Sequence, residues 1–375
     1  DFPIDFGNNI NSVDLFNIGD FNKDGINDVG LRTSSSIWNP VVWNKTLGGS
    51  KNEYATSIQQ TYDGSYIIAG QTESSDGDIS DGNNGGQDCW IVKLDSIGNK
   101  IWDKTLGGSS LDYANSILQT SDGGYIVAGT TLSNDGDISD GNNGGTDSWI
   151  IKLDSEGNKV WDKTFGGSGM DEAYSIKHTI DEGYIFVGGS ESNDGDISDG
   201  NNDLRDFWIV KLDSNGNKLW DKTLGGSGYD NALSIELTSD GGYIIGGTIN
   251  STRDGFSSDS NGDISEGYIL ESDIWIVKID SIGNKTWDRT FGGSSYDQLG
   301  SIKQTLDMGY IIAGSTYSEN VDVTDGNNGW NDCWVLKLDS VGNKAWDKTF
   351  GGSQEDGARS ILQTTDRGYI IVGTS

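Results

Sequence analysis

Short apolar runs separated by turn sequences make up most of this chain. In the stretch from residue 112 to residue 164, four such runs are rich in Ile, Val, Tyr, Trp and Thr. They occupy residues 115–120, 125–130, 148–153 and 159–164. These residue types favour a pleated strand, and no segment shows the spacing of an amphipathic helix. Glycine-containing turn sequences follow the first run and the third. Each unit is therefore predicted to be a four-stranded antiparallel meander, with strands A to D.

The unit recurs, and the phrase Trp-Asp-Lys-Thr-Leu/Phe-Gly-Gly-Ser marks each copy. The tryptophans of successive copies are 59, 59, 59, 67 and 59 residues apart. They are Trp43, Trp102, Trp161, Trp220, Trp287 and Trp346. A fixed period of this size indicates stacked copies of one unit that bury their apolar faces against each other. Repeated four-stranded units predict an all-β fold, a β-propeller, formed as a single domain by residues 1–375.

Strands A and B occur six times in repeat form, but strand C occurs only five times. Because a closed ring removes exposed strand edges, we expect residues 1–46 to close the ring and residues 47–375 to hold the repeats. In a six-bladed closure, residues 28–32 and 41–46 complete the last blade. In a seven-bladed closure, residues 13–46 form a short first blade and residues 2–6 complete the last one. We favour seven, because residues 13–32 have the pattern of a separate A and B pair.

The meander places the B–C and D–A loops on one face, here called the loop face, and the A–B and C–D turns on the opposite turn face. The B–C loops repeat an Asp-Gly-Asp-Ile-Ser-Asp-Gly sequence. Each D–A loop carries Gly-Gly-Ser followed by an acid. These acids are Glu53, Asp112, Asp171, Asp230, Asp297 and Asp356. Rigid scaffolds usually carry function on their loops, so any binding is expected on the loop face.

The chain has 58 acidic and 25 basic residues, a net charge of −33. This charge argues against partnership with nucleic acid or with an anionic membrane surface. No apolar stretch approaches the ~20 residues of a membrane span, so no membrane insertion is expected. The chain begins at Asp1 without methionine, which we interpret as a processed or trimmed secreted protein. Cys89 and Cys333 stand at the same position of two non-adjacent copies and are expected to be separate thiols.

A candidate Ca²⁺ site lies in the N-terminal segment. Oxygen-bearing side chains stand at alternate positions, a glycine follows for a sharp turn, and an acid ends the set. The candidate ligands are Asp20, Asn22, Asp24, the carbonyl of Ile26, and Asp28. Hard oxygen ligands at this spacing suit calcium. The alternative is a hairpin turn rich in Asp and Asn that holds no metal.

The repeated B–C loops give a second set of candidate cation ligands. Each has two aspartates and a serine at alternate positions, but its glycine comes one place late and no acid closes the shell. These ligands are Asp76, Asp78 and Ser80; Asp135, Asp137 and Ser139; and Asp194, Asp196 and Ser198. Asp112 or Asp147 would supply a further ligand. The alternative is a solvated loop that only connects strands.

Candidate catalytic groups are few. His178 is the single histidine, so no second histidine is available for a nucleophilic or zinc-binding set. Nearly every acid belongs to a repeated phrase, whereas catalysis needs one asymmetric cluster with perturbed pKa values. We therefore expect no enzymatic activity. The repeated Trp-Asp-Lys-Thr tryptophans are expected to pack between copies rather than to stack on sugars.

Two family resemblances add to this picture. The phrases at residues 106–109, 113–117, 124–129 and 152–158 resemble the seven-bladed β-propeller repeat of secreted and surface proteins of bacteria and archaea, over roughly residues 41–375. Residues 16–28 resemble the FG-GAP, or integrin-type, calcium loop. The resemblances imply an extracellular or cell-surface location and a structural or adhesive role.

The leading interpretation is a non-catalytic, calcium-stabilised extracellular module, with glycans or other surface proteins as partners. One alternative is a lectin-like propeller that binds carbohydrate between blades. It requires exposed aromatic side chains in the B–C loops, where Phe256, Tyr268 and Trp330 qualify. The other alternative is a polysaccharide hydrolase or lyase, which requires a unique acidic cluster in the central channel.

Overall fold

The computed structural model describes residues 14–19, 28–33, 43–201, 204–250, 263–265 and 271–374. Their regular elements are all strands, and the strands within each sheet pair in antiparallel fashion. In this part of the chain no helix is long and apolar enough to cross a bilayer.

Five four-stranded sheets follow the sequence repeat, and we number them as blades 1 to 5. Blade 1 contains β3 (Glu53–Gln60), β4 (Tyr66–Thr72), β5 (Asp88–Leu94) and β6 (Lys100–Leu106). Blade 2 contains β7 (Asp112–Gln119), β8 (Tyr125–Thr131), β9 (Asp147–Leu153) and β10 (Lys159–Phe165). Blade 3 contains β11 (Asp171–His178), β12 (Tyr184–Ser190), β13 (Asp206–Leu212) and β14 (Lys218–Leu224). Blade 4 contains β15 (Asn231–Leu237), β16 (Tyr243–Asn250), β17 (Ser272–Ile279) and β18 (Lys285–Phe291). Blade 5 contains β19 (Asp297–Gln304), β20 (Tyr310–Thr316), β21 (Asp332–Leu338) and β22 (Lys344–Phe350).

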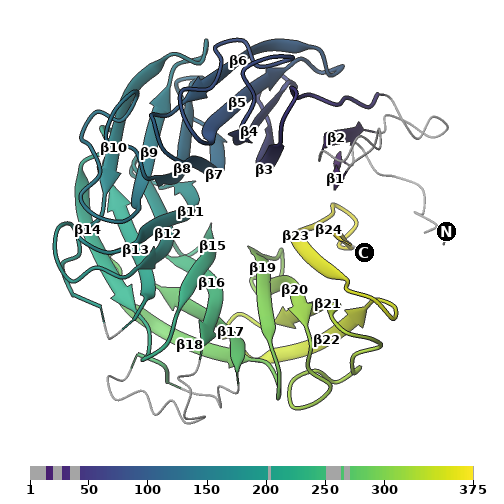
Figure 1. The fold of residues 1–375 in the computed structure, drawn as a ribbon. Helices are drawn as coiled ribbons and strands as arrows, with labels where there is room; N and C mark the ends of the chain where they lie inside the picture. Colours follow the sequence, from purple (N-terminus) through teal and green to yellow (C-terminus); the bar gives the residue numbers. More distant parts are fainter. Residues whose placement is uncertain are drawn as a thin grey trace.

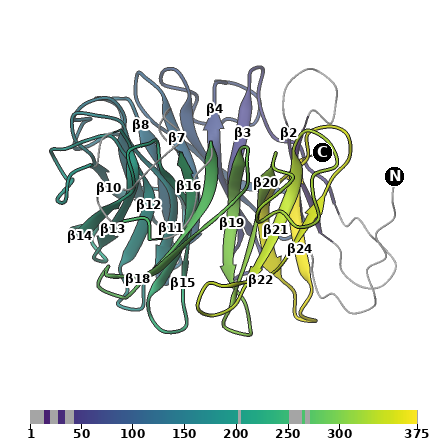
Figure 2. The same cartoon turned by 90° about the horizontal axis from the view of Figure 1, so that it is seen from below.

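The blades are arranged around a central opening, with the first strand of each blade innermost (Figure 1). Successive inner strands β3, β7, β11, β15 and β19 contact each other. Figure 2 shows the ring edge-on, with the strands running across its thickness. The predicted all-β propeller architecture is confirmed by this arrangement.

Two further sheets have two strands each: β23 (Gly357–Gln363) with β24 (Tyr369–Thr374), and β1 (Asp14–Gly19) with β2 (Asp28–Thr33). β1 contacts β24 and β2 contacts β3, so this pair lies between the last repeat and blade 1 (Figure 1). Residues 2–6 and 34–42, which distinguish the two closures, lie outside the described residues. The preference for seven blades over six is therefore not confirmed.

The hydrophobic core lies between blades rather than inside one. One cluster joins Ile67 and Ile91 of blade 1 to Ile117, Val127 and Trp149 of blade 2, all of them almost fully buried. The two middle strands are covered on both faces because they stand between two neighbouring blades, and every residue of β5, β8 and β9 is buried. Each blade thus depends on its neighbours for its core.

The Trp-Asp-Lys-Thr phrase makes the joint between blades. Trp102 of blade 1 meets Tyr125 of blade 2 edge-to-face, with ring centroids 5.8 Å apart, and four other copies repeat this contact. The aspartate of the phrase accepts the indole N–H of the strand C tryptophan, as in Trp90 Nε1 to Asp103 Oδ2 at 3.1 Å. The prediction that these tryptophans pack between copies is confirmed.

Candidate functional site

The acid of each D–A loop closes that loop on itself. In blade 2 the Asp112 carboxylate accepts the backbone N–H of Gly108 at 2.8 Å and the hydroxyl of Ser133 at 2.8 Å. The other five acids accept the N–H of the equivalent glycine at 2.7 to 2.9 Å. These carboxylates therefore satisfy backbone donors that a tight loop would otherwise leave unpaired.

The B–C loop aspartates hold the neighbouring D–A loop. In blade 1, Asp76 Oδ1 accepts the N–H of Ser50 at 2.8 Å and Asp78 Oδ2 accepts the N–H of Gly48 at 3.1 Å. Ser80 donates its N–H to Asp103 at 2.8 Å. The three predicted ligands thus face two different elements, the D–A loop and β6.

The same contacts recur in the next two blades. In blade 2, Asp135 accepts from Ser109, Asp137 from Gly107, and Ser139 donates to Asp162. In blade 3, Asp194 accepts from Ser168, Asp196 from Gly166, and Ser198 donates to Asp221. Within the described ranges, no group of three or more acids, histidines or cysteines is arranged to hold a metal ion.

Of the five N-terminal calcium candidates, the structure describes only Asp28. Asp20, Asn22, Asp24 and Ile26 lie outside the described residues, and Asp28 begins β2. Calcium binding by this segment stays a prediction.

A second buried acid, at the start of strand C, stands beside five of the six D–A loops. Asp88 is fully buried, and its Oδ2 accepts the N–H of Asn84 at 2.6 Å, whereas its Oδ1 has no hydrogen-bond partner. A Cβ atom on Gly107 would lie 2.6 Å from Asp88 Oδ1 and 2.8 Å from Asp112 Oδ2, so only glycine fits between the two carboxyl groups. Burial, with the Asp112 and Asp137 charges, raises the pKa of Asp88 to about 6.

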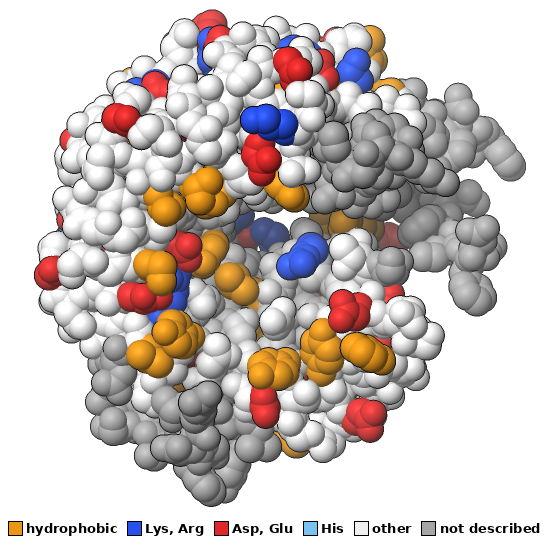
Figure 3. Space-filling model, in the orientation of Figure 1, with side chains coloured by type: hydrophobic (Ala, Val, Ile, Leu, Met, Phe, Trp, Pro, Cys, Tyr) orange, Lys and Arg blue, Asp and Glu red, His pale blue; other side chains and the backbone are white. Residues whose placement is uncertain are grey.

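Exposed apolar side chains occur at one repeated position of the loop face. The residue before the D–A acid is Met170, Tyr229 or Tyr296 in three copies, and each side chain is about half exposed. Trp330, in the B–C loop of blade 5, is 70% exposed, as the lectin-like alternative requires, while Phe256 and Tyr268 lie outside the described residues. Figure 3 shows hydrophobic side chains gathered around the central opening on the face that it displays.

The sequence motifs did not identify the exposed apolar residues of the D–A loops as candidate binding residues. The signal was available, because an apolar residue directly precedes the acid at Leu111, Met170, Tyr229 and Tyr296. The lectin-like alternative names exposed aromatic residues in the B–C loops alone.

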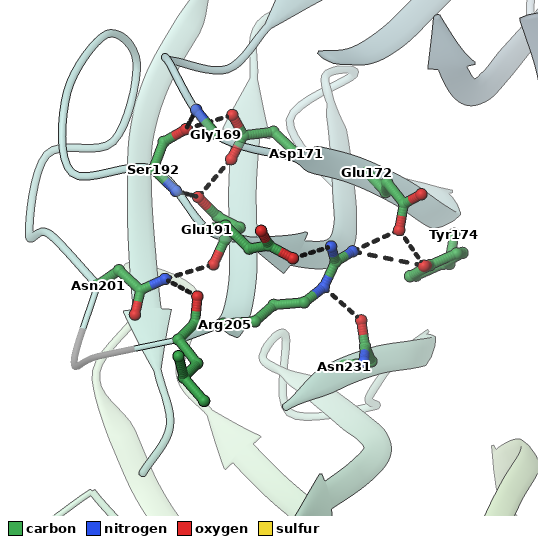
Figure 4. A network of polar contacts seen from close by, with 11 residues as sticks. Gly169, Asp171, Glu172, Tyr174, Glu191, Ser192, Asn201, Arg205 and Asn231 are labelled. Carbon is green, nitrogen blue, oxygen red and sulfur yellow. Dashed lines mark hydrogen bonds and ion pairs between the residues drawn. The ribbon is translucent and has the colours of Figure 1, made fainter. Parts of the chain in front are cut away.

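One loop-face junction carries a network that is not repeated among the other described junctions. Arg205 is almost fully buried and pairs with Glu172 and with Glu191, the latter at 3.4 Å. Its Nε donates to Asn231 Oδ1 of blade 4 at 2.7 Å (Figure 4). Burial and the Glu172 carboxylate raise the pKa of Tyr174, whose hydroxyl donates to Glu172. Because the guanidinium of Arg205 contacts side chains of both blades, it joins blades 3 and 4.

Three charged residues from neighbouring inner strands also meet. Glu236 of β15 pairs with Lys303 of β19 at 2.5 Å and with Lys177 of β11 at 3.4 Å. Burial and the neighbouring Lys303 lower the pKa of Lys177 to about 8. Figure 3 shows basic side chains inside the central opening.

The remaining reactive residues have structural surroundings. His178 Nε2 lies 3.1 Å from the carbonyl oxygen of Gln119, and its ring packs beside Tyr184. Cys89 and Cys333 are free thiols, as predicted. Burial raises the pKa of both thiols, that of Cys333 to about 11.

Comparisons with known proteins add little to this geometry. No protein-family model matches the chain. A stretch of 162 residues, 41% of the chain, is 25% identical to the regulatory protein FlaEY of Caulobacter vibrioides, of which the chain spans 17%.

Several solved structures align with most of the chain. A protein of unknown function from Bacteroides caccae aligns over 90% of this chain and 93% of its own, with a TM-score of 0.47 and 11% identity. BamB from Moraxella catarrhalis aligns over 98% and 99%, with a TM-score of 0.44 and 14% identity. YCF48 bound to D1 peptide aligns over 96% and 91%, with a TM-score of 0.45 and 11% identity. Since every score is below 0.5, the fold assignment rests on the strand arrangement described above.

Proposed function

We propose that this protein is a non-catalytic, extracellular structural or adhesive module, stabilised by calcium, that binds its partner through the loop face. The exposed apolar side chains of Met170, Tyr229, Tyr296 and Trp330 carry the proposal, because they gather on the face formed by the long loops. Tyrosine and tryptophan of this kind are enriched at binding surfaces. The repeated acids support a structural role, since they hold the loops through backbone N–H groups.

Adhesion is tested by retention on beads coated with collagen, albumin or chitin, in calcium and in chelator. The loop-face variant Tyr229→Ser/Tyr296→Ser/Trp330→Ala removes three exposed side chains. The matched control, Tyr62→Ser/Ile180→Ser/Leu306→Ser, removes three exposed side chains from the turn face. We expect at least about a tenfold loss of retention for the loop-face variant only, the size of a single hot-spot loss.

Two results contradict the proposal. Retention that is absent on every surface, or equal in both variants, excludes adhesion through the loop face. Turnover of a polysaccharide that disappears when one inner-strand carboxylate is changed would support the hydrolase or lyase alternative.

A further inference from the structure

A groove opens on the loop face between blades 1 and 2, with a volume of about 340 Å³. Blade 1 contributes Lys51, Glu73, Gly86 and Gln87. Leu111, directly before β7, and Tyr113, on β7, complete the lining from the side of blade 2. The volume falls at the lower end of the ~300–1,000 Å³ range of small-molecule sites.

The groove is open because position 86 carries glycine, which has no side chain, and position 87 carries an uncharged glutamine. A Cβ atom on Gly86 would lie 2.7 Å from Leu111 Cδ2, so a larger residue there would displace the leucine. Gln87, directly before the strand C aspartate, extends to Glu73 and donates to its Oε1 at 2.6 Å.

At the junction of blades 3 and 4, an arginine fills the equivalent position, and we call this the closed junction. Arg205 stands where Gln87 stands, Glu191 where Glu73 stands, and Asn231 where Tyr113 stands. The arginine spans the junction and reaches both Glu191 and Asn231 (Figure 4). The comparison of the two junctions indicates that the groove depends on the residue at position 87.

The lining of the open groove offers both donors and acceptors beside an apolar surface. The Glu73 carboxylate has no ion-pair partner among the described residues, since its contacts are the amides of Gln87 and Asn52. Lys51 provides an ammonium group and Tyr113 a hydroxyl group on an aromatic ring, next to Leu111.

Gln71 marks a second difference between the two junctions. It occupies the register position of Gly189, which packs against Arg205 and Asn231 in the closed junction. Its Oε1 is buried and has no hydrogen-bond partner.

A ligand that fits this lining donates and accepts hydrogen bonds and presents a C–H face to Tyr113 and Leu111. Sugar hydroxyl groups do both, and sugar rings have such a face. The Glu73 carboxylate and the net charge of −33 disfavour an anionic ligand, and the Lys51 ammonium disfavours a cationic one. We propose that the groove between blades 1 and 2 binds a neutral mono- or disaccharide.

The test uses the full chain and a panel of glucose, galactose, mannose, N-acetylglucosamine, cellobiose and lactose, measured by saturation-transfer NMR and calorimetry. The variant Gln87→Arg reproduces the arginine of the closed junction and is expected to weaken binding by at least about tenfold while the melting temperature stays the same or rises. The double variant Gln87→Arg/Gln71→Gly also places a glycine beside the new arginine, as Gly189 stands beside Arg205. It covers the case in which the arginine of the single variant clashes with Gln71. The control Arg205→Gln, at the other junction, should leave saccharide affinity unchanged.

Failure to bind any sugar of the panel at millimolar concentration overturns the proposal, and so does full binding by both position-87 variants. A preference for acidic sugars or for peptides in this groove also overturns it. The groove lies apart from Tyr229, Tyr296 and Trp330, so the loop-face variant described for adhesion keeps it intact. Adhesion and saccharide binding are therefore separable results.

Discussion

Asp88 and its equivalents Asp147 and Asp332 each bury a carboxyl oxygen that has no hydrogen-bond donor. The pKa of Asp88 is raised from 3.8 to about 6, so between these values the folded protein binds more protons than the unfolded chain. The contribution of this group to stability is therefore present at low pH and is lost as the pH rises through about 6. At ~1.4 kcal/mol per pKa unit, the loss is at most about 3 kcal/mol.

Asp88→Asn should remove this pH dependence, because the amide oxygen still accepts the Asn84 N–H and carries no charge. We expect the variant to gain melting temperature over the wild type when the pH is raised from about 5 to about 8. Thermal unfolding across this range measures the difference. Asp81→Asn, an exposed change, serves as the control, and an equal gain in both variants would contradict the assignment to Asp88.

A second residue-scale prediction concerns backbone strain in the A–B turns. Glu182 has a φ of 63°, where the matching turns of other blades have Gly64, Gly123 and Gly241. Left-handed backbone costs a non-glycine residue roughly 1 kcal/mol. Glu182→Gly should therefore stabilise the protein by about 0.5–1 kcal/mol, measured by urea unfolding. Glu156→Gly, at an exposed turn position without positive φ, should not be stabilising.

Steric crowding at glycine also constrains a whole element, the D–A loop. In five of the six loops a glycine stands between two acids, and in the loop that leads into blade 2 this glycine is Gly107. Gly107→Ala would push a methyl group against Asp88 and Asp112, and overpacking of this kind costs roughly 1–3 kcal/mol. In the last D–A loop, Gly352 follows the position equivalent to Gly107, and apart from its chain neighbours the nearest atom to a Cβ there would be Asp356 Oδ2 at 4.0 Å. Chemical denaturation should show a loss of stability for Gly107→Ala and almost none for Gly352→Ala.

The elements themselves were predictable because every copy repeats the same strands, turns and joints. The sequence predicted strand limits around Tyr125 and Trp149 that agree with β8 and β9. It did not predict what the loop acids contact, because Asp76 and Asp78 bond to backbone N–H groups, which carry no side-chain signature. The same is true of Arg205, whose partners come from both blades 3 and 4.

At the scale of the whole molecule, the charge of −33 bears on stability in two ways. Repulsion among the acidic groups destabilises the compact state, and a bound cation reduces this repulsion. If the segment around Asp24 binds Ca²⁺, calcium at a hundredfold excess over Kd stabilises the fold by about 2.7 kcal/mol. Chelator should then lower the melting temperature of the wild type, and Asp24→Ala should abolish the response. Identical melting in calcium and in chelator would show that no such site contributes.

The placement of the core between blades affects how a chain of this kind changes in length. Unequal crossing-over between the gene segments for Trp102 and Trp161 would delete one 59-residue copy and join half of one interface to half of the next. Both halves carry the same tryptophan and tyrosine, so the new joint would resemble the old ones. Only the angle between blades would have to change, and the width of the central opening would change with it. Arg205 is the exception: a crossover that separates it from Glu172 or from Asn231 would leave a buried guanidinium short of partners, so the junction of blades 3 and 4 would be inherited as a unit.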